Sequence, residues 1–285
     1  MIKLENVVLA SPEQMEFIIQ GMRNPMNSWE RSDSHICRQD GSFCMECEHK
    51  NYYCLGQNDN SLMQRLANAG TEHRKYMRMM PVYVMITAPL YWWKEFDTYK
   101  VGTVANSCST MHKIAEKEFT LEDFSIEHLD GIIANDTINI IIHCLNFYRS
   151  CFVKSKSKDD WWQMIQLLPS SYNQTRNVML NYEVLANIYR QRKNHKLDEW
   201  REVCKWIETL PYSELITVDS SEAIKEELRK EIMKARKISA PWEAHGTAEY
   251  AKIHPDQLIT IAEMEADARR AIPADRRCGE EGEGL

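Results

Sequence analysis

The chain has 285 residues, 44% hydrophobic and 27% charged, enough to bury the core of one large domain or two small ones. This composition excludes fibrous and wholly disordered proteins. The formal net charge of −7 argues against a broad basic surface for duplex nucleic acid, although a local cationic pocket for a phosphate is compatible with it. No apolar run is long enough to span a membrane, and the first residues lack a signal-peptide pattern, so we expect a cytoplasmic protein.

The first hundred residues predict short helices and one strand. The capping sequence Ser11-Pro12-Glu13-Gln14 marks the start of the first helix, and a β-branched run that stops at Pro89 marks the strand. Residues 24–58 are polar and lack apolar periodicity, so we expect a loop or small insertion there. The expected elements are helices near 12–22, 61–70 and 90–99 and a strand near 80–87.

Residues 121–210 carry an almost wholly helical pattern, interrupted by prolines. The apolar spacing supports helices within 138–152, 161–168, 178–189 and 197–207. The predicted fold class is therefore helix-rich α+β. We expect one domain over residues 1–217, followed by a charged helical appendage over residues 218–285 with a disordered acidic end.

Four cysteines lie close together in a Cys-rich insertion at residues 35–57. Cys37, Cys44, Cys47 and Cys54 follow the spacing C-x6-C-x2-C-x6-C. Four thiolates can close a tetrahedral zinc site, and the central Cys-x-x-Cys places two sulfurs on one turn. A structural zinc site is one interpretation. An iron–sulfur cluster and a polar loop with free thiols are the alternatives.

The run from Ala88 to Lys113 joins a strand end, Ala-Pro, an aromatic helix and a hydroxyl-rich loop, and it resembles the core of the flavin-dependent thymidylate synthases. In an ungapped alignment, Thr98-Tyr99-Lys100 takes the place of that family's Arg-His-Arg. The later motif positions, two serines and a closing arginine, are taken by Thr103, Cys108 and Thr110. Most motif side chains therefore differ from the family's pattern.

Two further segments resemble the family in the expected order. Residues 62–73 look like its helix leading into a flavin-contacting His turn. The family's Leu-Pro, Asn, Leu-Arg and His-Ala-Gln-x-Glu-x-Arg positions correspond to Leu168-Pro169, Asn181, Arg192, His195, Glu199 and Arg201. The resemblance covers residues 60–210.

The resemblance implies a small antiparallel sheet, FAD as cofactor, a pyrimidine nucleotide such as dUMP as substrate, folate as one-carbon donor, and a homo-oligomer, expected to be a tetramer. It implies cofactor contacts from His73, Thr98, Tyr99, Lys100, Thr103 and Arg192. It implies substrate contacts from Asn106, Ser107, Cys108, Ser109, Thr110, Arg176 and Arg190. It assigns no catalytic side chain, because in this family the protein mainly positions its ligands.

Three functional hypotheses follow. The first is a divergent flavin-dependent enzyme that methylates dUMP. The second is a non-catalytic nucleotide-binding descendant of that fold, motivated by the replaced Arg-His-Arg, because lysine cannot copy the bidentate contacts of arginine. The third is a zinc-stabilised interaction protein. The helical spacing of Trp92, Trp93 and Phe96 favours a place in the core over a stack against flavin.

Overall fold

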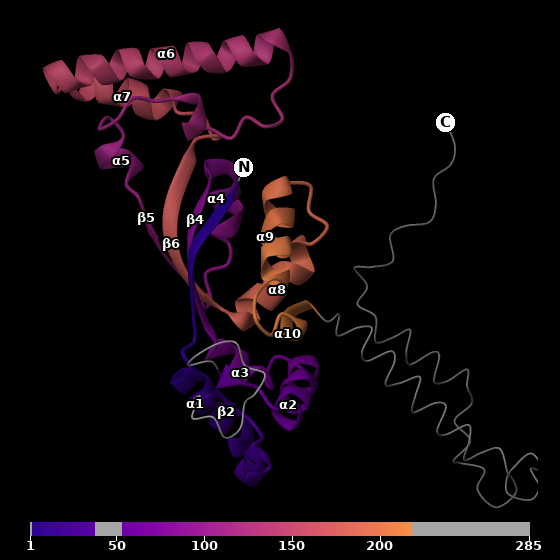
Figure 1. The fold of residues 1–285 in the computed structure, drawn as a ribbon. Helices are drawn as coiled ribbons and strands as arrows, with labels where there is room; N and C mark the ends of the chain where they lie inside the picture. Colours follow the sequence, from indigo (N-terminus) through magenta and orange to yellow (C-terminus); the bar gives the residue numbers. More distant parts are fainter. Residues whose placement is uncertain (1, 38–52, 218–285) are drawn as a thin grey trace, which may run out of the picture. The chain divides into compact units, whose positions relative to one another are not determined.

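The computed structural model describes residues 2–37 and 53–217 (Figure 1), so the expected appendage at 218–285, together with Cys44 and Cys47, lies outside the described residues. None of the described helices is both long and apolar enough to cross a membrane. The strands are β1 (Lys3–Leu9), β2 (His35–Ile36), β3 (Tyr53–Cys54), β4 (Pro81–Pro89), β5 (Val104–Ser107) and β6 (Asn173–Asn181). The α-helices are α1 (Pro12–Arg23), α2 (Gln57–Asn68), α3 (Lys75–Arg78), α4 (Leu90–Phe96), α5 (Thr110–Lys113), α6 (Gly131–Ser155), α7 (Lys158–Leu167), α8 (Tyr182–Arg192), α9 (Asp198–Glu208) and α10 (Glu214–Thr217). The short 3-10 helices are η1 (Asn24–Met26), η2 (Trp29–Arg31) and η3 (Leu121–Asp123).

A four-stranded antiparallel sheet of order β1-β4-β6-β5 forms the centre of the described domain. The β4 and β6 strands pair along their whole length, from Pro81 opposite Asn181 to Pro89 opposite Asn173. Side chains alternate along β4: Val82 and Val84 are buried, and Tyr83 between them is exposed. This sheet confirms the expected fold class, and β4 confirms the predicted strand.

The prediction of nearly continuous helix over 121–210 is wrong at residues 173–181, which form β6. The apolar residues Val178 to Leu180 fit a helical face as readily as a strand. Pairing with β4 decides the outcome, because it satisfies the backbone of β6 and buries Val178 against Val84. The edge strands β1 and β5 were not predicted either, since each is short and lacks a clear alternation.

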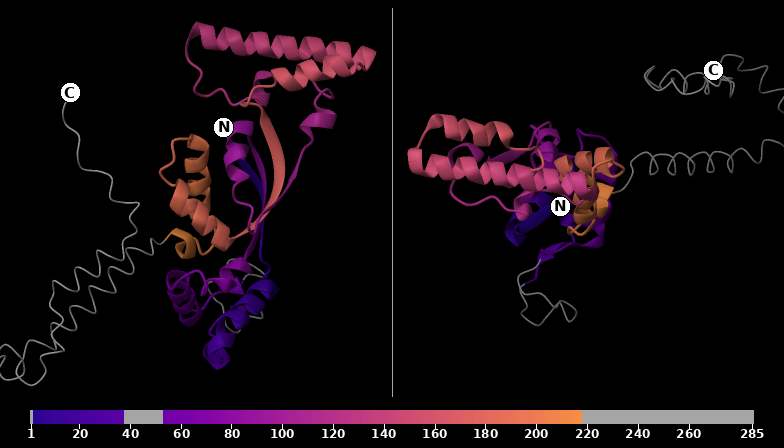
Figure 2. Two further views of the ribbon diagram at one scale, coloured as in Figure 1. Left: turned by 180° about the vertical axis from the view of Figure 1, so that it is seen from behind. Right: turned by 90° about the horizontal axis from the view of Figure 1, so that it is seen from above.

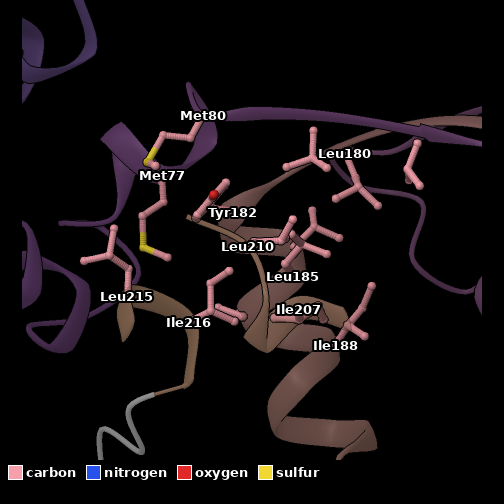
Figure 3. Close-up of a cluster of buried hydrophobic side chains, with 14 of the residues drawn as sticks. Met77, Met80, Leu180, Tyr182, Leu185, Ile188, Ile207, Leu210, Leu215 and Ile216 are labelled. Carbon is pink, nitrogen blue, oxygen red and sulfur yellow. The ribbon is translucent and has the colours of Figure 1, made fainter. Parts of the chain in front are cut away.

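The main core fills the face of the sheet on which α4, α8 and α9 pack (Figures 1 and 2). Figure 3 shows how Met77 and Met80, from the segment before β4, meet side chains from β6, α8, α9 and α10. Trp92 and Trp93 are fully buried, and Trp92 lies 4.7 Å from Trp200 between ring centroids. The tryptophan pair is therefore core, as its spacing favoured.

A second core lies at the end of the sheet where β6 begins, beneath α6 and α7 (Figures 1 and 2). Leu145 of α6 and Met164 of α7 are both fully buried in it. The 25-residue α6 ends at Ser155, and the next residue, Lys156, adopts a left-handed conformation with φ of 57°. This second core positions α6 and α7 side by side, away from α8 and α9.

The buried carboxylate of Asp59 organises the expected loop region. Its Oδ1 accepts a hydrogen bond from Arg23 Nε at 2.5 Å, and its Oδ2 accepts from Ser32 Oγ at 2.8 Å and from the backbone N of Asp33 and Ser34 at 3.1 Å. These bonds hold the chain just before the β2–β3 ladder, in which His35 pairs with Cys54. Burial alone would raise the pKa of Asp59, but the hydroxyl hydrogen bonds and Arg23 bring it below its ordinary value of 3.8.

We predict that Asp59→Asn lowers the free energy of unfolding by about 3 kcal/mol, because it leaves the buried Arg23 without its countercharge. The lowered pKa means that the carboxylate stabilises the fold above about pH 4 and that this contribution is lost as the pH falls further. Urea unfolding at pH 7 and pH 3 measures both effects. The exposed Asp136→Asn is the control; equal stability of the two variants at pH 7 would contradict the prediction.

Candidate functional site

Glu95, on α4, is the hub of a polar cluster that joins α4 to the end of α8 and to α9. Its Oε2 accepts hydrogen bonds from Arg192 Nη1 at 2.8 Å and from Trp200 Nε1 at 2.9 Å. His195 Nε2 lies 3.5 Å from the same oxygen. The backbone N of Leu197 donates to His195 Nδ1, which leaves Nε2 as the N–H of the ring facing Glu95. A carboxylate held by this many donors is rigidly oriented.

Tyr99 and Arg192, two expected cofactor contacts, meet in this cluster. Arg192 Nε donates to the Tyr99 hydroxyl at 2.9 Å, and that hydroxyl donates to Gln191 Oε1 at 2.8 Å. The Arg192 guanidinium also lies over the Trp200 ring, 4.8 Å from its centroid. Next to them, the Tyr91 hydroxyl donates to the buried Glu199; burial first, and then this carboxylate, raise the pKa of Tyr91.

Arg176 lies on the inner face of β6 and is also paired. Its Nη1 donates to Asp97 Oδ1 at 2.7 Å and its Nε donates to Gln174 Oε1 at 2.9 Å, while its guanidinium stacks over Trp93 at 4.1 Å from the ring centroid. The Gln174 amide in turn donates to the backbone carbonyl of Cys108 at 2.9 Å. Arg176 therefore links α4 to the segment that follows β5.

Two of the three arginines that the resemblance assigned to ligands are thus neutralised by carboxylates, Arg192 by Glu95 and Arg176 by Asp97. Sequence reasoning did not single out either acid. A signal was present, because Glu95 follows Lys94 in the aromatic helix and Asp97 directly follows that helix. An anionic ligand on this side has to compete with two acids already in place.

The hydroxyls between α4 and β5 shape a turn. Thr98 Oγ1 donates to the carbonyl of Glu95 at 2.7 Å, and Thr103 Oγ1 donates to the carbonyl of Tyr99. Gly102 has φ of +77°, and a side chain there would press on Asn181 and Val184. Lys100 is exposed on this turn and forms no ion pair with the residues that the structure describes.

The expected substrate contacts from Asn106 to Thr110 lie along the exposed edge of the sheet. Strand alternation places Ser107 on the inner face beside Arg176, whereas Asn106 points to the opposite face beside Asn177. Ser109 caps α5, accepting a hydrogen bond from the backbone N of His112 at 3.0 Å; Thr110 follows it in α5, and Cys108 is exposed. Asn106 and Ser107 therefore do not converge on one ligand from the same side.

Arg190 points away from Arg192 because two helical residues differ by about 200° around the axis. It lies toward Arg74, whose side chain is 6% exposed and whose Nη1 has no hydrogen-bond partner among the described residues. Burial, and then the charge of Arg190, lower the pKa of Arg74. Arg78 pairs with Glu183, the acid whose charge also acts on Arg74.

His73 precedes Arg74 on the turn before α3 and has half of its side chain exposed, 3.6 Å from Glu72. It lines an apolar cavity of about 580 Å³ between α1, α2 and α3, within the size range of small-molecule pockets. The cavity wall includes the flexible side chains of Met22, Met26 and Met79. His73 and Arg190 thus lie around Arg74, apart from the Glu95 cluster.

Within residues 2–37 and 53–217, no group of three or more His, Cys, Asp or Glu side chains could hold a metal ion. Cys37 is buried and Cys54 half-buried at the ends of the β2–β3 ladder.

We predict that Glu95→Gln lowers the free energy of unfolding by about 1 to 2 kcal/mol, because glutamine keeps an acceptor oxygen for Trp200 but loses the charge that holds Arg192. Urea unfolding followed by tryptophan fluorescence measures the change. Glu202→Gln, which removes an exposed pair on α9, should cost less than about 0.5 kcal/mol. Equal effects of the two substitutions would show that the cluster does not join the helices.

No family model and no curated protein matches this chain. Among solved structures, it is similar to two of flavin-dependent thymidylate synthase ThyX from Helicobacter pylori, both containing FAD and dUMP. One aligns with a TM-score of 0.51 and 18% identity over 75% of this chain and 97% of that chain. The other aligns with a TM-score of 0.52 and 16% identity over 76% of this chain and 97% of that chain. The chain thus has a ThyX-like fold.

Proposed function

We propose that this chain is a divergent relative of the flavin-dependent thymidylate synthases that binds FAD and a pyrimidine nucleotide. The observation that supports this most is the extent of the fold likeness, which spans 97% of two ThyX chains whose structures contain FAD and dUMP. Nearly the whole length of that ligand-binding fold therefore has a counterpart in this chain.

The surroundings of Arg74 fit the anionic part of FAD. Among the described residues, Glu183 pairs with Arg78 and its charge also acts on Arg74, one nitrogen of Arg74 has no hydrogen-bond partner, and the charge of Arg190, which the resemblance assigned to the substrate, also acts on Arg74. Such a cluster of guanidinium groups favours a pyrophosphate. The methionine-lined cavity beside His73 lies against the same turn and suits a planar ring. The buried Trp92 and Trp93 cannot serve as that ring's wall.

The nucleotide would lie on the inner face of β5, near Ser107 and Arg176. It would also lie near Tyr99 and Arg192, which the resemblance assigned to the cofactor. Its phosphate would have to displace Glu95 or Asp97 from an arginine, whereas the exposed Lys100 offers a charge without that competition. Bound FAD in its reduced form would supply the hydride for methylation of dUMP with a folate donor. Nucleotide binding without turnover is the alternative, and the paired state of both arginines favours it.

We predict that the fresh protein shows a flavin absorption band or takes up FAD in calorimetry. Arg190→Ala should weaken FAD binding about tenfold, a loss of about 1.4 kcal/mol, because it removes charge next to Arg74. Its own hydrogen bonds run within α8, so the fold should persist. Lys205→Ala, which removes one positive charge from an exposed pair with Glu202, is the matched control. A colourless protein that takes up no FAD would contradict the proposal.

Methyl transfer is tested with the same protein, dUMP, a methylene-folate donor and a reductant for the flavin. Formation of the methylated nucleotide supports the enzymatic form of the proposal. Retained binding of FAD and nucleotide without product supports the non-catalytic form.

We also propose that Cys37, Cys44, Cys47 and Cys54 hold a structural zinc ion. Their spacing supports this, and the β2–β3 ladder ties together the two ends of the insertion. Elemental analysis of the full chain, prepared without chelator, should give about one zinc per chain, and Cys47→Ser should lower that content. Iron with a visible charge-transfer band would favour a cluster instead. Absence of both metals would contradict a metal site.

A further inference from the structure

A cavity of about 490 Å³ lies on the outer side of α1, which packs beside β2 (Figure 1). Its volume is within the range of small-molecule pockets. The wall combines aromatic and acidic side chains: Phe17, Trp29, Tyr53, Glu13 and Glu16. Among the described residues, it shares no lining side chain with the methionine-lined cavity beside His73. It is therefore separate from the proposed FAD side.

The helical spacing of α1 turns these groups away from the core. Glu13, Phe17 and Gln20 follow each other at intervals of four and three residues, so they form one side of the helix. Glu16, four residues before Gln20, lies on the same side. The opposite side carries the buried residues Met15, Ile18, Ile19 and Met22. The fold therefore does not need the outer side of α1 for its core.

Aromatic rings border this cavity from two elements. Phe17 of α1 is 65% exposed and Trp29 of η2 is 45% exposed. The indole Nε1 of Trp29 donates to Asn24 Oδ1 at 2.8 Å, which holds the ring in place. Tyr53 of β3 is buried and adds a third ring to the wall. The face of an aromatic ring carries negative electrostatic potential, so rings placed in this way attract a cation.

The two glutamates give the cavity an unbalanced negative charge. Glu13 accepts a hydrogen bond from the Ser11 hydroxyl at 2.8 Å, and neither Glu13 nor Glu16 forms an ion pair with the described residues. Burial first, and then the charges of Asp59 and Glu16, raise the pKa of Tyr53 to about 12. Glu16 is thus close enough to Tyr53 for both to act on one occupant.

The surroundings also indicate the type of cation. Arg23 reaches the same wall, but its Nε donates to Asp59 Oδ1, so it does not neutralise the glutamates. A metal ion does not fit, because no group of three or more potential ligands exists among the described His, Cys, Asp and Glu side chains. An alkylated ammonium ion needs no such ligands. Its diffuse charge suits the carboxylates, and its methyl groups suit the rings.

We propose that this cavity binds a small quaternary ammonium compound such as choline. The methyl groups would contact Phe17 and Trp29, while Glu13 and Glu16 balance the positive charge. The same carboxylates repel a ligand that carries its own phosphate, so choline should bind more tightly than phosphocholine. This inference does not rest on the proposed function, because it involves neither FAD nor the nucleotide.

Saturation-transfer NMR of the ligand methyl groups tests the chemistry with the full chain. Choline and tetramethylammonium should bind with dissociation constants of about 1 mM. Dimethylbutanol, the neutral carbon isostere of choline, and phosphocholine should each bind at least about tenfold more weakly. No choline binding at about 20 mM would overturn the proposal, as would equal binding of choline and either comparison compound.

Substitutions in the wall test the location. Trp29→Ala should weaken choline binding at least about tenfold, whereas Trp29→Phe, which keeps a ring, should cost less. Glu16→Gln should weaken binding about threefold. The matched controls are Trp162→Ala, at a tryptophan 40% exposed on α7, and Glu202→Gln on α9; both should leave binding unchanged. Circular dichroism checks that each variant is folded. Unchanged binding in folded Trp29→Ala or Trp29→Phe and Glu16→Gln, or an equal loss in the controls, would overturn the proposal. FAD binding is measured separately, so its failure leaves this test intact.

Discussion

The proposed nucleotide site next to β5 depends on the contacts that the Glu95 carboxylate makes. It receives Arg192, Trp200 and His195 on one oxygen, and thereby ties α4 to α8 and α9 over the tryptophan core. The same contact cancels the charge of Arg192, just as Asp97 cancels that of Arg176. One interaction thus stabilises the arrangement of the helices and sets the electrostatic character of the surface next to β5. Because Arg176 and Arg192 are each paired with a carboxylate, their charges are cancelled on this surface. An open anion-binding site would instead present unpaired positive charge.

The two sides of α8 therefore differ in how the nearby arginines are paired. On the side that faces α4, Arg192 is paired with Glu95 and Arg176 with Asp97. Toward α3, Arg74 is buried with one nitrogen that lacks a hydrogen-bond partner among the described residues, and the charge of Arg190 acts on it. Burying a guanidinium group without a full set of partners lowers stability. A bound anion would supply the missing partner of Arg74, which fits an anion site here.

Much of the fold followed from local sequence patterns. A β-branched run that stops at Pro89 predicted β4, capping at Ser11 predicted α1, and helical spacing placed Trp92 and Trp93 in the core, because each of these depends on neighbouring residues. Residues 173–181 form a strand because they pair with β4. A local sequence pattern cannot predict a partner that lies far away in the sequence. Arg192 and Glu95 form a pair although they are 97 residues apart in the sequence. Both residues are visible in the sequence, but no local pattern predicts that they meet. Likewise, Asn106 and Ser107 were both expected to contact the substrate, but the register of β5 places them on opposite faces of the sheet.

The most direct test of this account compares the binding of dUMP with that of deoxyuridine, which lacks the phosphate, by calorimetry on the wild-type chain and Glu95→Gln. If Glu95 occupies Arg192, the phosphate should add little affinity in the wild-type chain and at least tenfold in the variant, about 1.4 kcal/mol. A large and equal phosphate contribution in both proteins, or no binding of either ligand to either protein, would contradict the account.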